Sequence, residues 1–184
     1  MRRRFVAGAV VALVLALGTG PAYSARFPTL TAHGPGTVTG TSATAVFKIG
    51  DNTVRRIRYA DRKVLRYSFD LKNDGWLPIT VTGLAPPAHR PTLFIYAGLE
   101  DADGRSKFTI GAHSRTTVTL SMLMTSCEKL ASRAGSFATQ VRIRTTGLGV
   151  IDATTVAELP EQIHTGSPRE ASCSRATSTS RPAG

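Results

Sequence analysis

Basic side chains are concentrated in one short stretch of this chain, which has 23 Lys and Arg residues against 12 Asp and Glu residues. Within residues 55–66, cations are opposed only by Asp61: Arg55, Arg56, Arg58, Arg62, Lys63 and Arg66. Arg142 and Arg144 alternate on a later segment and are expected to point outward. A surface of one charge sign attracts polyanions, and salt weakens such binding. These residues are candidates for binding an anionic cell-wall polymer such as teichoic acid, or anionic lipid headgroups. The alternative is a solvated face without a ligand.

Histidines are the usual acid–base residues, and the four in this chain are scattered as His33, His89, His113 and His164. None belongs to a GxSxG, HExxH or SxxK motif, in which a fixed spacing brings a nucleophile or a metal to its base. A catalytic group would have to assemble from distant segments, with a histidine beside a carboxylate in a pocket. The sequence therefore predicts a protein that is not an enzyme, and it assigns no catalytic residue.

Met122 and Met124, with His113 nearby, are of the residue types that bind copper. Both methionines, however, alternate in step with Val118 and Leu120, which is the pattern of side chains that face a core. We therefore expect them to be core residues and predict no metal there.

The segment Asp101-Ala102-Asp103-Gly104 resembles the start of a calcium loop. A complete loop needs further oxygen ligands and a bidentate Glu at its twelfth position, and these are missing. We interpret the segment as a hairpin turn between two strands. No metal or cofactor is expected for this chain.

One stretch gives the clearest structural signal. Apolar and polar side chains alternate strictly over residues 65–72, which buries one row of a strand: Leu65, Tyr67, Phe69 and Leu71. Residues 73–75, Asn-Asp-Gly, tolerate turn dihedrals, and a second alternating run follows at 79–82. We expect the two runs to pair as antiparallel strands. Trp76, just after the turn, is expected to close the end of the core; the alternative is an exposed binding anchor.

Further short runs predict more strands: 43–49, 53–59, 92–97, 107–110, 115–124, 137–145 and 150–159. In the run at 137–145, we expect the following side chains to face the core: Phe137, Val141 and Ile143. Only residues 126–134 are typical of a helical turn. About seven to nine short strands with frequent turns predict an all-β chain, folded as an antiparallel β-sandwich over residues 43–164. Residues 25–42 are expected to form an extended lead-in, and the Ser/Thr/Arg-rich residues 165–184 a flexible, disordered tail.

The N-terminus is typical of a secretory signal peptide over residues 1–24. Three arginines precede an apolar helical run at residues 5–17, and small residues at 22–24 suit signal peptidase. Cleavage lowers the net charge from +11 to 11 − 3 = +8. Because a spanning helix needs about 20 apolar residues, we expect export rather than anchoring. An uncleaved membrane anchor is the alternative.

Both cysteines, Cys127 and Cys173, lie in the part expected to be exported. An even pair in an oxidising compartment predicts a disulfide. It would fix part of the C-terminal tail and stabilise the fold by about 4 kcal/mol in the chain-entropy model. A free thiol, or half of a metal site, is the alternative.

Two motifs carry a family resemblance. The run FTIGAHSRTTVTL at residues 108–120 resembles the F-x-L-x-P-G-x-x-x-x-V-x-L run of bacterial immunoglobulin-like extracellular domains, with Ala112 where that pattern prefers Gly. The segment Asn73-Asp74-Gly75 before residues 78–81, PITV, resembles the strand exit of the same domains. The chain is thus similar to secreted actinobacterial proteins of unknown function with an immunoglobulin-like β-sandwich. The resemblance implies a fold but no functional residue.

Together these observations predict a secreted, monomeric, non-catalytic binding or structural module associated with the cell envelope. Its expected partner is an anionic wall polymer or an extracellular protein, and it contacts a membrane only if the signal segment is retained. Nucleic acid is not expected, because the chain lacks aromatic platforms on which bases stack. Two alternatives stay open: a protease-inhibitor-like or other protein-binding domain that uses the proline-rich loop at residues 85–91, and polyanion binding through the basic face.

Overall fold

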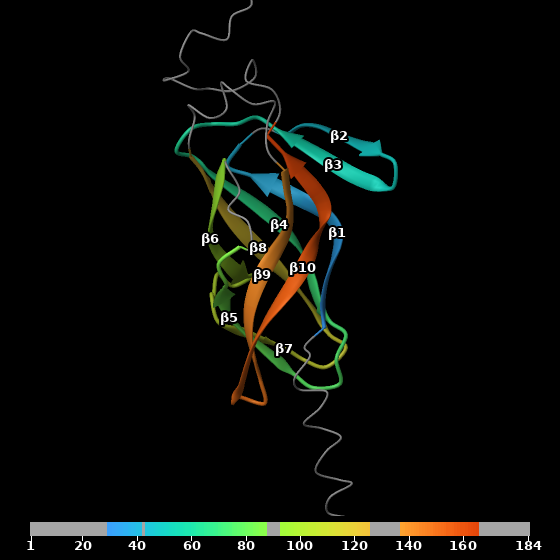
Figure 1. The fold of residues 1–184 in the computed structure, drawn as a ribbon, viewed down its shortest axis with the longest axis vertical. Coiled ribbons are helices and arrows are strands. Elements are labelled where there is room, and N and C mark those ends of the chain that lie inside the picture. Colours follow the sequence, from blue (N-terminus) through green and yellow to red (C-terminus); the bar gives the residue numbers. More distant parts are fainter. Residues whose placement is uncertain (1–28, 42, 88–92, 126–136, 166–184) are drawn as a thin grey trace, which may run out of the picture.

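The structure, a computed structural model, describes residues 29–41, 43–87, 93–125 and 137–165. Within these ranges the chain forms ten strands and no helix. The strands belong to two sheets that pack face to face as a sandwich (Figure 1). The all-β prediction is therefore confirmed for the described part of the chain.

The four-stranded sheet has the order β1 (Leu30–Thr39), β4 (Val64–Asn73), β8 (Arg115–Met124) and β6 (Phe94–Asp101), and all its pairs are antiparallel. Cross-strand partners share a face, and β4 pairs Tyr67 with Leu120 and Phe69 with Val118. All four of these side chains are buried, so the alternation of each strand is matched by that of its neighbour.

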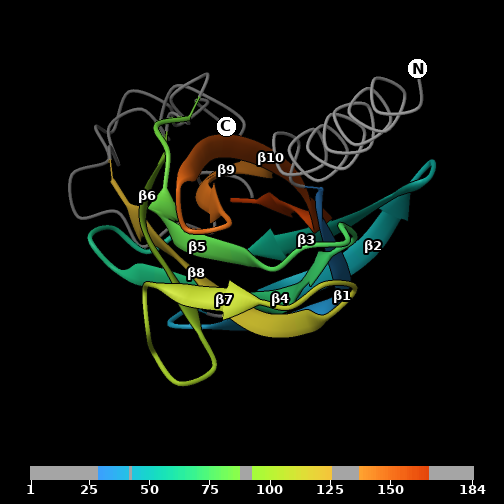
Figure 2. The same ribbon diagram turned by 90° about the horizontal axis from the view of Figure 1, so that it is seen from below.

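The six-stranded sheet has the order β2 (Ala43–Ile49), β3 (Asn52–Ile57), β10 (Ile151–His164), β9 (Phe137–Gly147), β5 (Ile79–Leu84) and β7 (Phe108–Ile110). Its pairs are antiparallel except the one between β10 and β3, which is parallel. Seen from below, the two sheets curve around a common interior (Figure 2).

The core lies between the sheets and draws apolar side chains from both. Met122 and Met124 are fully buried in it, which confirms the prediction that they are core residues. Fully burying one such side chain stabilises the fold by about 1.5–3 kcal/mol, so the alternating strands supply the main driving force for folding.

The predicted pairing of residues 65–72 with 79–82 is wrong. The strand β4 pairs with β1 and β8, whereas β5 pairs with β9 and β7 in the other sheet. Residues 74–78 therefore cross from one sheet to the other rather than turning back on β4. The interpretation of the Asp101–Gly104 segment as a hairpin turn is wrong for the same reason, because β6 and β7 also lie in different sheets.

Part of the expected lead-in at residues 25–42 is a strand. Although β1 pairs along β4, its register shifts between His33 and Thr37, where Gly34 has a φ of 110°. The shift breaks the alternation of buried residues, so the sequence showed no period there. At the other end of the chain, β10 reaches His164, beyond the predicted residue 159.

Two single-residue predictions are also wrong. Phe137 is half exposed rather than inward, because β9 has a register shift against β10 that turns the first residues of β9 the other way; Val141 and Ile143 are buried as expected. Trp76 does not close the core but is exposed.

Candidate functional site

The predicted basic face is divided by the structure, and Arg55 is removed from it. The Arg55 guanidinium makes a bidentate pair with Glu161, with Nε to Oε2 at 2.6 Å and Nη2 to Oε1 at 2.9 Å. Its Nη2 also donates to the Gly36 carbonyl at 2.8 Å. The Arg55 side chain is 14% exposed and that of Glu161 is 5% exposed. Arg55 is therefore a structural ion-pair residue.

This ion pair ties the two sheets together. Arg55 and Glu161 stand on β3 and β10 of the six-stranded sheet, and Gly36 and Tyr67 on β1 and β4 of the other. The Tyr67 hydroxyl donates to Glu161 at 3.4 Å. The burial of Tyr67, followed by the negative charge of Glu161, raises the pKa of Tyr67. The hydrogen bond to Glu161 raises the pKa of Arg55. Tyr67 therefore stays neutral and Arg55 stays charged over the physiological pH range, which suits a structural role.

Arg142 and Arg144 stand on the outer side of β9 but in different surroundings. Arg142 is half-buried and donates from Nη1 to the Pro86 carbonyl at 3.0 Å. Arg144 is exposed and lines an open hollow of about 500 Å³, together with threonines and Asp152. Asp152 lines the same hollow as Arg144, so the charge lining it is mixed.

Four of the predicted cations remain exposed near one end of the sandwich: Arg58, Arg62, Lys63 and Arg66. We call this set the basic end. The connection that carries it is fixed to β8, since Arg62 N donates to the Met124 carbonyl and Met124 N to the Lys63 carbonyl, both at 3.0 Å. Asp61 lies 3.8 Å from Arg62 and neutralises only part of the charge. Arg56, the remaining predicted cation, is half-buried.

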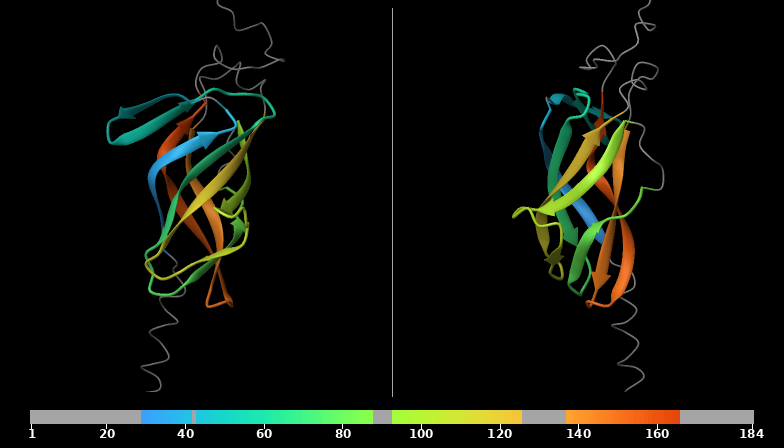
Figure 3. Two further views of the ribbon diagram at one scale, coloured as in Figure 1. Left: turned by 180° about the vertical axis from the view of Figure 1, so that it is seen from behind. Right: turned by 90° about the vertical axis from the view of Figure 1, so that its left-hand side faces the viewer.

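The β2–β3 hairpin projects from the body of the sandwich, and we call residues 43–57 the arm (Figures 1 and 3). Among the described strands, β2 lies at an edge and pairs with β3 alone. Phe47 and Ile49 are 40% and 57% exposed on one face of β2, and Val46 is 50% exposed on the other. Apolar edge strands are templates for pairing with another chain, and proteins normally protect them with charges, prolines or bulges. Among residues 45–49, Lys48 is the one charge on this edge.

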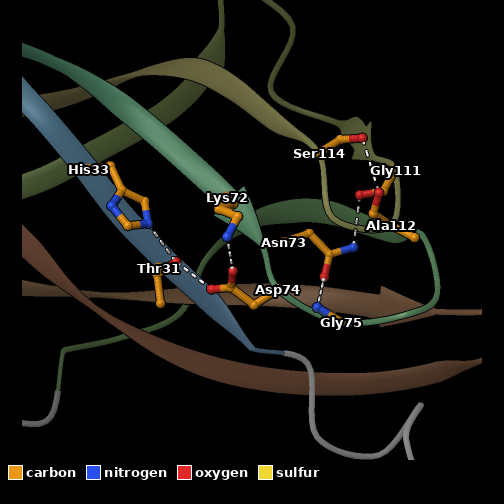
Figure 4. Close-up of polar contacts among 9 residues, drawn as sticks. All are labelled: Thr31, His33, Lys72, Asn73, Asp74, Gly75, Gly111, Ala112 and Ser114. Carbon is orange, nitrogen blue, oxygen red and sulfur yellow. Dashed lines mark hydrogen bonds and ion pairs between the residues drawn. The ribbon is translucent and has the colours of Figure 1, made fainter.

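At the opposite end of β4, Asn73 joins two connections. The side chain is fully buried; its Nδ2 donates to the carbonyls of Leu77 and Gly111 at 2.8 and 3.1 Å, and its Oδ1 accepts from Gly75 N at 2.9 Å. His113 N donates to the Gly75 carbonyl at 3.2 Å. Residues 73–75 and residues 108–120 thus meet here, and the hydrogen bonds between them fix the shape of both connections (Figure 4).

A cluster of polar side chains from β1, from β4 and from Asp74 lies beside the hydrogen bonds of Asn73 (Figure 4). Asp74 accepts from the Thr31 hydroxyl and pairs with Lys72, both at 2.5 Å, and these two contacts hold the pKa of Asp74 below its ordinary value. His33 Nε2 lies 2.9 Å from the Thr31 oxygen. Because Thr31 gives its single proton to Asp74, His33 must donate to Thr31. A nucleophile–base pair needs the reverse order, so the cluster is not arranged for covalent catalysis.

The other described histidines lie against aromatic rings. His113 packs edge-on against Trp76, with ring centroids 4.6 Å apart, and His164 packs on Phe137 at 4.5 Å. His89 lies outside the described residues, as do Cys127 and Cys173, so the disulfide stays a prediction. The proline-rich loop at residues 85–91 is described only to residue 87.

The acidic loop after β6 is closed by its own arginine. Asp101 Oδ2 accepts from Arg105 Nε and Nη2 at 2.8 and 2.7 Å, and Oδ1 from the backbone N of Asp103 and Arg105 at 3.0 and 2.9 Å. Burial opposes ionisation of this carboxylate, but the hydrogen bonds outweigh it and lower the pKa of Asp101. Within the described ranges, no group of three or more His, Cys, Asp or Glu side chains is placed to hold a metal ion.

Compared with models of protein families and with curated proteins, the chain has no match. In the described part of the chain, no helix is both long enough and apolar enough to cross a membrane. Glu161, which the sequence analysis missed, had one detectable signal: it alternates with Leu159 and Ile163 on an inward-facing row.

Proposed function

We propose that this chain is an exported, non-catalytic binding module of the cell envelope. Its sandwich would be immunoglobulin-like and would follow a signal peptide that is removed after Ser24. An extended segment of a partner protein would add to β2 as a further strand, with apolar residues at alternate positions. The single observation that carries the proposal is the arm, an apolar edge strand with exposed side chains on both faces.

Strand addition suits the geometry of β2. A partner strand takes up the free backbone groups of the edge, while its alternate side chains pack against Phe47 and Ile49 on one face and Val46 on the other. Main-chain hydrogen bonds supply affinity in this mode and need no special residue types. The absence of a sequence motif for binding is thus what strand addition would produce.

Co-sedimentation of the mature chain with cell envelope from which the lipid has been extracted tests this proposal. Binding should persist in high salt and disappear when the envelope is first digested with protease. Phe47→Asp should abolish it, because a charge then faces the apolar partner. Ile95→Asp is the matched control, since Ile95 is similarly exposed on β6, an edge of the other sheet, and it should bind normally. Equal binding by Phe47→Asp and the wild type would refute the proposal.

A second candidate function is polyanion binding at the basic end, which its four exposed cations favour. Binding of this kind should survive protease treatment of the envelope and be lost in high salt. Arg62→Glu should weaken it, whereas Lys107→Glu, at an exposed site outside the basic end, should not. Salt-resistant binding, or equal effects of the two charge reversals, would exclude this function.

A further inference from the structure

Three apolar side chains project from the end of the sandwich opposite the basic end. Trp76 is 79% exposed, Leu148 52% and Val150 81%. We call these three residues the apolar end. Trp76 belongs to the connection after β4, and the other two to the hairpin between β9 and β10, which reaches the lower limit of the described ribbon (Figures 1 and 3).

Strand register places these connections at the same end of the six-stranded sheet. Ile79, at the start of β5, pairs with Gly147 of β9 on one side and Ile110 of β7 on the other. Trp76 lies three residues before Ile79, and Leu148 directly follows Gly147. The exposed apolar side chains of the two connections therefore lie at the same end of the sheet.

The apolar end is held in shape by the fold. The hydrogen bonds of Asn73 fix the loop before Trp76, and His113 supports the Trp76 ring from the side. The hairpin is closed by Val150 N, which donates to the Gly147 carbonyl at 3.2 Å. Leu148 has a φ of 51°, a conformation in which Gly or Asn is the usual residue. Ordinary turn chemistry thus does not account for an exposed leucine at this position.

The shape and chemistry of this end suit a bilayer surface. Projecting tips cannot enclose a small molecule, and the one hollow described above lies on the outer side of β5, β9 and β10. Tryptophan favours the boundary between lipid headgroups and acyl chains, because its ring is amphipathic. Leucine and valine tips gain free energy by leaving water for the acyl region. Arg115, exposed at this end of β8, carries a charge that suits lipid headgroups, whereas its register partner Lys72 on β4 is paired with Asp74.

The course of the chain gives a second, independent indication. Thr29 O accepts from Asp74 N at 3.0 Å, so the chain enters the sandwich at the same end as Trp76. The apolar run at residues 5–17 precedes Thr29 in the sequence. If that run is held in a bilayer during export, the apolar end is the end of the sandwich from which the chain leads to it.

We propose that the apolar end docks on the surface of a phospholipid bilayer, with Trp76, Leu148 and Val150 inserted into the interface. This inference goes beyond the proposed function: it concerns lipid rather than a protein partner, and it uses a surface separate from the arm. Phe47→Asp should therefore leave lipid binding unchanged.

The chain contains a single tryptophan, so its fluorescence reports directly on this end. The probes are vesicles of phosphatidylcholine and of phosphatidylcholine mixed equally with phosphatidylglycerol, added to mature protein (residues 25–184). We expect the emission to shift to the blue with both vesicles, and lipids brominated on their acyl chains to quench it. Leu148→Asp and Val150→Asp should each weaken vesicle binding about tenfold or more, from the apolar area lost to the interface.

Val156→Asp is the matched control, because Val156 is about as exposed as Leu148 but lies within β10, away from the tip. It should bind vesicles as the wild type does, and circular dichroism should show that all variants are folded. Loss of binding equal to that of Leu148→Asp would overturn the proposal. Unchanged emission with both vesicles would also overturn it, as would an emission shift caused by soluble wall saccharides and not by vesicles. Binding to anionic vesicles alone, without an emission shift, would overturn it too, because the contact would then lie at the basic end.

Discussion

Replacing Glu161 with alanine should destabilise the folded chain by about 3 kcal/mol. The Glu161 carboxylate accepts two hydrogen bonds from Arg55, at 2.6 and 2.9 Å, and a longer one from Tyr67 at 3.4 Å. Without it, Arg55 keeps the Gly36 carbonyl but is only 14% exposed to water. Removing one partner of a buried ion pair costs about 3–5 kcal/mol, and the remaining carbonyl and the partial access to water place the cost at the lower limit.

Urea unfolding of the mature chain, followed by circular dichroism, measures this free energy. Glu158→Ala is the matched control: Glu158 stands on the same strand but is exposed, and its replacement should change stability by no more than about 0.5 kcal/mol. Glu161→Gln, which keeps the shape and one acceptor but removes the charge, should lie between the two alanine variants.

If Glu161→Ala lowers the free energy of unfolding by no more than Glu158→Ala does, the ion pair does not stabilise the fold as inferred. A double replacement tests its physical cause. Arg55→Met with Glu161→Leu removes both charges and fills their space with apolar groups, which should restore most of the lost stability. If the double variant is as unstable as Glu161→Ala, the cost does not come from an unpaired buried charge.

Two further predictions concern Gly36 and Asp101. A Cβ on Gly36 would overlap the Tyr67 ring, so Gly36→Ala should destabilise the folded chain by about 1–3 kcal/mol. Gly98→Ala is the control and should not destabilise it, because the space around a Cβ at Gly98 is open. Equal melting temperatures of the two variants would contradict this prediction. The pKa of Asp101 is lower in the folded than in the unfolded chain, where it is near 3.8, so its stabilisation is complete above that pH and is lost as the pH falls through the folded-state pKa. Asp101→Asn should therefore flatten the fall in stability below about pH 4, and an acid-unfolding curve identical to the wild type would contradict the role given to the Arg105 hydrogen bonds.

Several elements of the fold were predictable because their signal is local. The alternation in β4 and β8 identified both strands and their buried rows, since on a strand the position of a side chain depends only on the parity of its residue number. β1 lacked that signal, because its register shift near Gly34 interrupts the alternation. The prediction of strands thus succeeded where the pleat is regular and failed at a bulge.

Strand pairing and the candidate sites depended on contacts between distant residues. Nothing local to Arg55 distinguishes it from Arg58, yet the Arg55 side chain is 14% exposed and Arg58 is exposed on the surface. The difference is Glu161, which lies 106 positions away in sequence. The exposure of Trp76 was likewise undetermined, because it depends on how Asn73 directs the chain from one sheet to the other.

The sequence by itself determined an all-β chain, the buried row of each regular strand and the clustering of basic residues, because hydrophobic burial acts on a pattern that repeats every second residue. Only the tertiary structure decided which strands share a sheet, which arginines remain in water, and which apolar side chains are left exposed on the arm and the apolar end. Those outcomes depend on which surfaces the other sheet covers, and that coverage is set by packing between segments far apart in the chain.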